Sequence, residues 1–186
     1  MNRLIAALLM ALLLALTLGQ AAHASEVTSV PSLDLDRYAG KWLEIARFPN
    51  RFQAMCIGNV SADYRRRDDG EIDVINRCKN TDGKLEQAIG RGRVVDAVSR
   101  ARLKVRFAPA WLAWLPQGWG DYWILDLAPD YSLAAVGDPS RQYLWILARQ
   151  PVLPAGAYDA LLARLAAQGF DVAKLVITKQ EPEPGK

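Results

Sequence analysis

Apolar and polar residues alternate along most of this chain, with the two-residue period of β-strands that face a core on one side. In residues 101–107, three apolar residues alternate with three basic ones. Turn sequences such as 68–70 and 80–83 join the segments, and no helical period separates them, which predicts an antiparallel up-and-down sheet. Closing that sheet into an all-β, eight-stranded barrel removes its free edges. The predicted strands are 40–48, 56–64, 71–78, 87–96, 101–107, 121–127, 131–137 and 143–149.

The period changes after the eighth segment. Tyr158, Leu161 and Leu165 lie on one stripe of a predicted helix over 155–168, which Gly169 ends. We expect this single C-terminal α-helix to pack on the outside of the barrel. Residues 170–178 predict one further strand. The whole forms one domain over 36–180, preceded by a polar arm at 25–35 and followed by a tail at 181–186 that we expect to be disordered.

The N-terminal residues 1–24 have the pattern of a secretory signal peptide. A basic residue, Arg3, precedes an apolar run at 4–18, and Ala22-His23-Ala24 forms a small-residue cleavage site. We expect cleavage after Ala24 and export of the mature chain. No cysteine lies near this position, so the segment offers no thiol for lipid attachment.

Composition limits the chemistry of the mature chain. The one histidine, His23, lies in the predicted signal peptide, which excludes Ser-His-Asp catalysis, His-ligated haem and His-bearing zinc sites. Two cysteines cannot build a four-cysteine metal site. The net charge of +3 is spread out, and the basic run at 65–67 is followed at once by two aspartates. We therefore predict no catalytic residue, no metal, no cofactor and no nucleic-acid partner.

Counting strands brings distant residues to one end of the barrel. If the first strand runs from the base to the mouth, Trp42 lies at the base, where Gly40 lets the backbone turn. Asp126 then ends the sixth strand at the base, Tyr131 begins the seventh there, and Arg149 ends the eighth. A guanidinium stacked on an indole stabilises such an arrangement by about 0.5–2 kcal/mol. We therefore predict that Arg149 contacts Trp42.

These residues resemble the three signatures of the lipocalins. Gly40-x-Trp42 resembles the first signature, the turn at 126–131 the second, and Arg149 the third. The resemblance covers nearly all of residues 36–180 in order. It implies an eight-stranded barrel that binds a small hydrophobic ligand and acts as a binding protein rather than an enzyme. An isomerase or epoxide-converting lipocalin and a tetrapyrrole carrier remain alternatives.

The segment 143–149, with the pairs at 69–70 and 76–77, is similar to the bacterial outer-membrane and apolipoprotein D-like lipocalins. This implies a fatty acid or lysophospholipid as ligand, and a role in lipid storage, transport or membrane maintenance. Many of the bacterial relatives carry a lipid-anchoring cysteine at the cleavage site, which this chain lacks. We therefore expect a protein that is free in the periplasm or peripheral at the outer membrane, and not a lipid-anchored lipoprotein. We also expect a monomer or weak dimer.

Strand parity predicts which side chains line the barrel. Glu44 shares the face of Trp42, Ala46 and Phe48; it either contacts a ligand head group or is a buried carboxylate satisfied by an interior partner, and the cost of an unpaired buried charge favours the latter. A completely filled interior is the alternative to a cavity, although the small residues of the fourth strand argue against it. The predicted ligand-binding residues are Val60, Ala62, Tyr64, Val74, Asn76, Gly90, Leu103, Val105, Phe107, Tyr143, Trp145 and Leu147.

Two features lie at the predicted mouth. The loop containing Trp111, Trp114 and Trp119 is unusually apolar, and we consider a lid, a membrane-surface contact, or a loop folded back on the barrel wall. Cys56 and Cys78 begin the second strand and end the third, and they share a face. An oxidising compartment favours a disulfide between them, with free thiols as the alternative.

Overall fold

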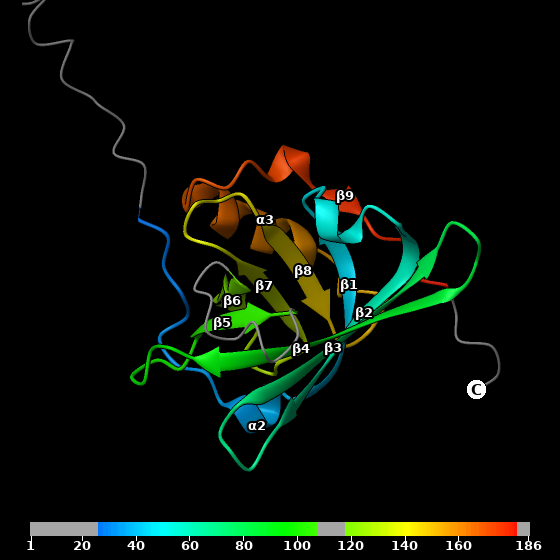
Figure 1. Cartoon of the computed structure of the whole chain (residues 1–186). Helices are drawn as coiled ribbons and strands as arrows, with labels where there is room; N and C mark the ends of the chain where they lie inside the picture. Colours follow the sequence, from blue (N-terminus) through cyan, green and yellow to red (C-terminus); the bar gives the residue numbers. More distant parts are fainter. Residues whose placement is uncertain (1–25, 108–117, 182–186) are drawn as a thin grey trace, which may run out of the picture.

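The computed structural model describes residues 26–107 and 118–181 (Figure 1), so the predicted signal peptide and residues 182–186 of the predicted tail lie outside it. Strands β1 to β8 pair with their sequence neighbours, and β1 also pairs with β8 and with β2, which closes the barrel. This confirms the predicted antiparallel up-and-down barrel. The strands are β1 Gly40–Arg47, β2 Cys56–Arg66, β3 Ile72–Asn80, β4 Leu85–Val94, β5 Arg102–Arg106, β6 Gly120–Leu127, β7 Leu133–Gly137 and β8 Leu144–Ala148.

The predicted helix is present as α3, Ala157–Ala167, and it packs on the outer wall of the barrel (Figure 1). Leu161 and Leu165 are fully buried in a hydrophobic cluster with Ile146 of β8. Asp126 of β6 accepts two hydrogen bonds from the guanidinium of Arg164, at 2.6 and 3.0 Å. This side-on pair therefore fixes the helix to the strand that it covers.

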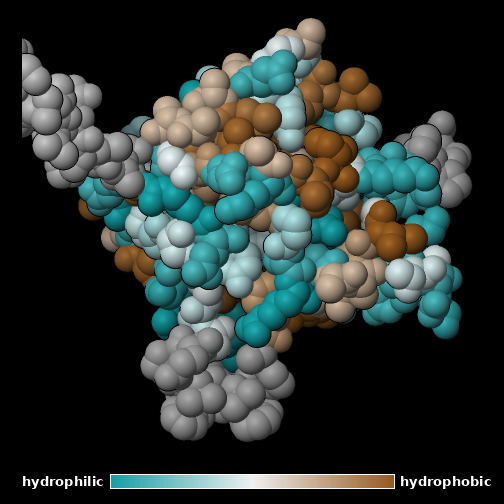
Figure 2. Space-filling model, turned by 90° about the horizontal axis from the view of Figure 1, so that it is seen from above, coloured by the Kyte–Doolittle hydropathy of each residue, from teal (hydrophilic) through white to brown (hydrophobic). Residues whose placement is uncertain are grey.

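The predicted strand at 170–178 is mostly wrong. Residues Val172–Lys174 form a 3₁₀ turn, η4, and only Val176–Ile177 form a strand, β9, which pairs with β1. Seen from above, the face that carries α3 and β9 shows hydrophobic patches interrupted by hydrophilic residues (Figure 2). The short β9 therefore adds to the barrel edge without building a further sheet.

The N-terminal arm is part of the folded domain. Leu33 is buried in the interior cluster at the base, while Val27 is buried in the outer cluster beside α3. Asp34 caps the short helix α2, Leu35–Tyr38, by accepting hydrogen bonds from two amides of its first turn. The arm and α2 together cover the base of the barrel (Figure 1).

Arg149 lies at the centre of this base. Its guanidinium carbon is 4.0 Å from the centroid of the Trp42 ring. The same group donates hydrogen bonds to the carbonyls of Arg37, Ala39 and Lys41, at 2.8, 2.9 and 2.7 Å. Between these carbonyls, Gly40 has a φ of +91°, which favours glycine. The strand count thus brought the right partners together, and the guanidinium also satisfies the backbone of the α2–β1 turn.

A β-bulge in β1 changes which side chains face the interior. Glu44 pairs with Leu147 of β8, but the next pairs are Ala46 with Ile146 and Arg47 with Trp145. The extra residue reverses the alternation beyond Glu44. The predicted common face of Trp42, Glu44, Ala46 and Phe48 is therefore wrong in its second half, because Ala46 and Phe48 belong to the outer cluster beside α3. Arg47 shares the face of Trp145, which packs against the interior cluster.

The C-terminal segment lies between the mouth halves of β1 and β2, which pair directly only near the base. We call this gap the β1–β2 seam. The amide of Asn59 donates to the carbonyl of Lys179 at 2.8 Å. The side-chain amide of Gln180 donates to the carbonyl of Glu44 in β1 and to that of Val60 in β2, at 2.7 and 2.9 Å. The end of the described chain thus completes the barrel wall at the seam.

We predict that Arg149→Ala lowers the free energy of unfolding by about 3 kcal/mol or more, because it removes charge-assisted hydrogen bonds and the stacking on Trp42 together. Arg65→Ala is the matched control, since Arg65 is exposed and pairs with Asp63 on the surface. That control should cost less than about 1 kcal/mol. Urea denaturation of both variants measures the difference, and equal losses would contradict a special role for Arg149.

Candidate functional site

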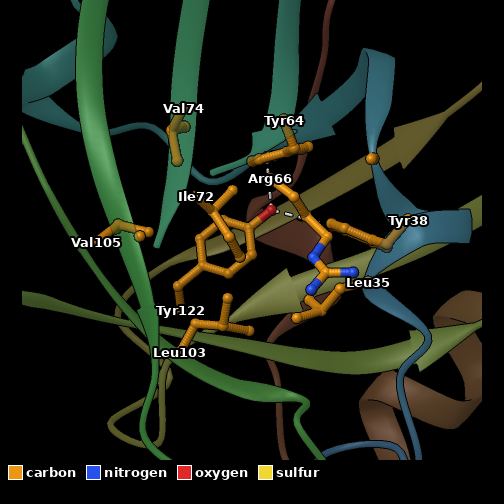
Figure 3. Close-up of a pocket in the computed structure, with 11 residues that line it drawn as sticks. Leu35, Tyr38, Tyr64, Arg66, Ile72, Val74, Leu103, Val105 and Tyr122 are labelled. Carbon is orange, nitrogen blue, oxygen red and sulfur yellow. Dashed lines mark hydrogen bonds between the residues drawn. The ribbon is translucent and has the colours of Figure 1, made fainter. Parts of the chain in front are cut away.

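The lower half of the barrel interior is closed by three tyrosines (Figure 3). The hydroxyl of Tyr122 lies 2.6 Å from that of Tyr64 and 3.1 Å from that of Tyr38. Around them is a cavity of about 20 Å³, close to the space that one water molecule needs. This tier is therefore a packed floor rather than a ligand chamber. Besides the tyrosines, its lining consists of Leu35, Ala39, Arg66, Ile72, Val74, Gly92, Leu103 and Val105.

Burial keeps these phenols neutral. Desolvation is the main cause that raises the pKa of Tyr38, Tyr64 and Tyr122 well above the ordinary value. The interactions among the tyrosines themselves raise the pKa of Tyr122 further. Each hydroxyl has a hydrogen-bond partner within the group, so none of the three buried tyrosine hydroxyls is left unsatisfied.

The predicted lining residues of β2 and β3 lie at different depths. Ala62, Tyr64 and Val74 are buried in the interior cluster. Asn76 pairs with Ala88, which has the strand parity of Gly90 and Gly92 and is exposed to solvent. Val60 is buried at the β1–β2 seam instead, after a shift in the β2–β3 register. The residues of this face are thus buried at the floor and more exposed toward the mouth.

The glycines of β4 leave space beside the strand, and the aromatic ring of Phe107 fills part of it. A Cβ on Gly90 would lie 2.7 Å from the ring of Phe107, so this ring passes directly over the glycine. Phe107 is nevertheless 43% exposed, while Leu103 is buried and Val105 is half-buried. This wall therefore presents accessible apolar surface inside the barrel.

The opposite wall is aromatic. The rings of Tyr143 and Trp145 stack with centroids 5.8 Å apart and an interplanar angle of 7°. Phe52, from the 3₁₀ turn η1 at Arg51–Gln53, lies 5.8 Å from Tyr143. Leu147 is buried one step nearer the floor. Together these side chains form an aromatic and apolar wall between the floor and the rim.

A polar cluster interrupts this wall where β1 bulges. The carboxylate of Glu44, 2% exposed, accepts from Arg47 Nη1 at 2.6 Å, from Gln53 Nε2 at 2.7 Å and from the hydroxyl of Thr178. Gln53 Oε1 accepts from the indole of Trp145 at 2.8 Å. Glu44 is thus a satisfied buried carboxylate, which is the favoured one of the two sequence interpretations.

Sequence reasoning missed three members of this cluster. Regular alternation from Trp42 to Phe48 predicts Arg47 on the outer face, because nothing in the residue pattern reveals the bulge. Gln53 lies in a loop, and Thr178 lies about 130 residues from its partner at the end of the chain. The only available signal was the inward parity of Glu44, which required some partner.

The predicted disulfide is confirmed. Cys56 and Cys78 are bonded, with Cα atoms 5.6 Å apart and a sequence separation of 22 residues. The bond ties the start of β2 to the end of β3 at the mouth. It therefore restrains the rim next to the seam and the polar cluster.

Only part of the predicted mouth loop is described, because Trp111 and Trp114 lie outside the described residues. Trp119 lies beside the outer wall of the barrel, with its ring 4.2 Å from the guanidinium of Arg93 and 5.1 Å from that of Arg106. Both arginines face outward from β4 and β5. For Trp119, this placement agrees with a segment folded against the wall.

Residues 26–107 and 118–181 contain no group of three or more His, Cys, Asp or Glu side chains that could hold a metal ion. Across the same residues, no helix has both the length and the apolar character needed to cross a membrane.

The chain is similar to several known proteins. The family model described as "Lipocalin-like domain" matches residues 33–180. Temperature-induced lipocalin-1 of Arabidopsis thaliana is 39% identical over 161 residues, covering 86% of each chain. The outer membrane lipoprotein Blc of Escherichia coli strain K12 is 39% identical over 155 residues, covering 83% of each. Apolipoprotein D of Macaca fascicularis is 32% identical over 176 residues, covering 89% of this chain and 88% of the relative.

Solved structures give the same picture of the fold. Insecticyanin from the tobacco hornworm Manduca sexta superposes with a TM-score of 0.64 at 18% identity, covering 83% of this chain and 84% of that one. Lobster apocrustacyanin A1 gives a TM-score of 0.61 at 18% identity, with 79% of each chain covered. At this identity the likeness shows the fold alone.

We predict that alkaline pH destabilises the protein through the tyrosine floor. A phenol with a raised pKa in the folded state keeps its full stabilising contribution below pH 10 and loses it as the pH rises further. Three such groups predict a loss of about 4 kcal/mol in the free energy of unfolding between pH 9 and pH 11. Tyr122→Phe should remove about a third of this pH dependence. Full phenolate absorbance at 295 nm from the folded protein at pH 11 would contradict the assignment.

Proposed function

Because this chain belongs to the lipocalin family, we propose that it binds one small hydrophobic ligand reversibly inside its barrel. The observation that carries the proposal is the set of apolar residues of interior parity above the tyrosine floor that keep accessible surface. Phe107 and Ala88 are exposed on one wall, and Tyr143 and Trp145 are half-buried on the other. Apolar surface of this kind is stabilised when a ligand covers it.

The proposed ligand is a single-chain lipid, either a fatty acid or a lysophospholipid. An acyl chain gains about 0.8 kcal/mol for each CH₂ that it buries. Fifteen buried methylenes therefore contribute about 12 kcal/mol, which leaves about 8 kcal/mol, or micromolar affinity, after about 4 kcal/mol offsets the cost of association. Such a ligand is held firmly enough to be carried and weakly enough to be released.

We propose binding without catalysis. The cysteines are joined in a disulfide, and the Glu44 carboxylate already accepts from three side chains. The described interior thus holds its reactive groups in structural interactions. A binding role in lipid storage, transport or membrane maintenance accords with this arrangement.

The proposed location is the periplasm, with export directed by residues 1–24 and without a lipid anchor. A disulfide is favoured in an oxidising compartment, which supports export. The name of the relative Blc, an outer membrane lipoprotein, supports a place in the cell envelope, while the proposal of no anchor rests on the lack of a cysteine near Ala24. Peripheral membrane contact through the 111–119 loop stays a prediction. Phe52 and Met55, exposed near the same mouth, support it. We propose a monomer or weak dimer.

Native mass spectrometry of the mature protein, followed by organic extraction, tests the carrier function directly. We predict about one single-chain lipid per protein molecule. Ala88→Trp should weaken the binding of a fluorescent fatty acid at least tenfold, because the indole would occupy the open interior. Gln87→Trp is the matched control, since Gln87 pairs with Arg77 on the outer face of the same strands. An empty protein whose fatty-acid binding is absent, or equally weak in both variants, would contradict the proposal.

A further inference from the structure

We infer that Arg47 binds the anionic head group of the ligand, a carboxylate or a phosphate, and that Glu44 and Thr178 position it. This inference rests on the proposed function and names the class of lipid that the interior takes. The bulge in β1 turns Arg47 inward beside Trp145, so a cation lies within the apolar wall. Its side chain is 13% exposed, so part of its surface remains accessible.

The hydrogen bonds of Arg47 leave one edge of the guanidinium available. Nη1 donates to Glu44 Oε1 at 2.6 Å and to Thr178 Oγ1 at 3.2 Å. Nη2 makes one long contact, 3.3 Å, with the carbonyl of Cys56. Within the described residues, no acceptor lies on Nε. The Nε–Nη2 edge is the one with which arginine binds a carboxylate side-on, and Arg164 uses this edge to bind Asp126.

Glu44 is the positioning residue of this site. Its two oxygens are already occupied by Arg47, Gln53 and Thr178, and its charge would repel an anion that approached it directly. By binding Nη1, it fixes the orientation of the guanidinium plane and directs the Nε–Nη2 edge elsewhere. A guanidinium held in this way loses little side-chain freedom when an oxyanion binds.

The surroundings of Arg47 match an amphiphile. Trp145 pairs with Arg47 across the strands and stacks on Tyr143, so a head group at Arg47 places its chain beside aromatic surface. The accessible Phe107 lies on the other wall. A ligand with one anionic end and one acyl chain satisfies both parts of the interior, whereas a neutral lipid leaves the guanidinium edge without an oxyanion.

Competition against a neutral fluorescent probe, N-phenyl-1-naphthylamine, tests the inference at pH 7. The competitors are oleate and oleoyl lysophosphatidic acid, with oleyl alcohol and monoolein as their neutral counterparts. The wild-type protein should bind each anion at least tenfold more tightly than its neutral counterpart. The stronger of the two anions identifies a carboxylate or a phosphate as the preferred group.

Arg47→Gln alone leaves the Glu44 charge buried, so the decisive variant is the double substitution Glu44→Gln with Arg47→Gln, which keeps the cluster polar and neutral. It should lose the preference for anions while its affinity for oleyl alcohol changes less than threefold. Arg51→Gln, which removes a cation stacked on Phe52 at the rim, is the control and should keep the preference. Equal binding of anionic and neutral lipids by the wild type, or an unchanged preference in the double variant, would overturn the inference and leave the proposed function intact. Failure of the wild type to bind any of the four lipids would overturn both.

Discussion

The contact of Arg149 with Trp42 and the carbonyls around Gly40 is the interaction on which the rest of the barrel depends. It joins the last barrel strand to the first and to the turn that leads out of α2. Backbone carbonyls at a closed barrel end need donors, and one guanidinium supplies several of them. The indole in turn covers the guanidinium and seals the interior. The contacts of Arg149 therefore link the closure of the sheet to the closure of its base.

Much of this architecture follows from the sequence, because alternation and turn chemistry specify strands with little ambiguity. Strand order and the meeting of Trp42 with Arg149 require only counting. The bulge in β1 cannot be predicted by counting, since Ile45 is an ordinary strand residue and the bulge appears only in the pairing with β8. One inserted residue moved Arg47 from the expected outer face to the interior. The residue pattern therefore could not predict that Arg47, the cation of the candidate site, faces the interior.

The interior combines a neutral polar floor with a charged pair near the mouth, and the two solve different physical problems. The phenols of Tyr38, Tyr64 and Tyr122 fill the narrow end while satisfying one another. The pair of Glu44 and Arg47 carries full charges, so it needs several additional donors and acceptors, which come from η1 and from the chain end. Strand parity predicted Tyr64, Tyr143 and Trp145 as lining residues, but it did not predict Tyr38 or Tyr122. Partners supplied by loops have no periodic signal.

The C-terminal segment in the β1–β2 seam has a consequence for how the molecule forms. β1 is among the first strands to be synthesised, yet its neighbour at the mouth, β9, comes from the last part of the chain. A growing chain can assemble the meander in order, since each hairpin contact is local, but the seam is filled only after residues 176–180 have been made. The pairing of β1 with β8, and with β2 near the base, does not require these residues. The contact of Thr178 with Glu44 is therefore among the last that the described chain can form.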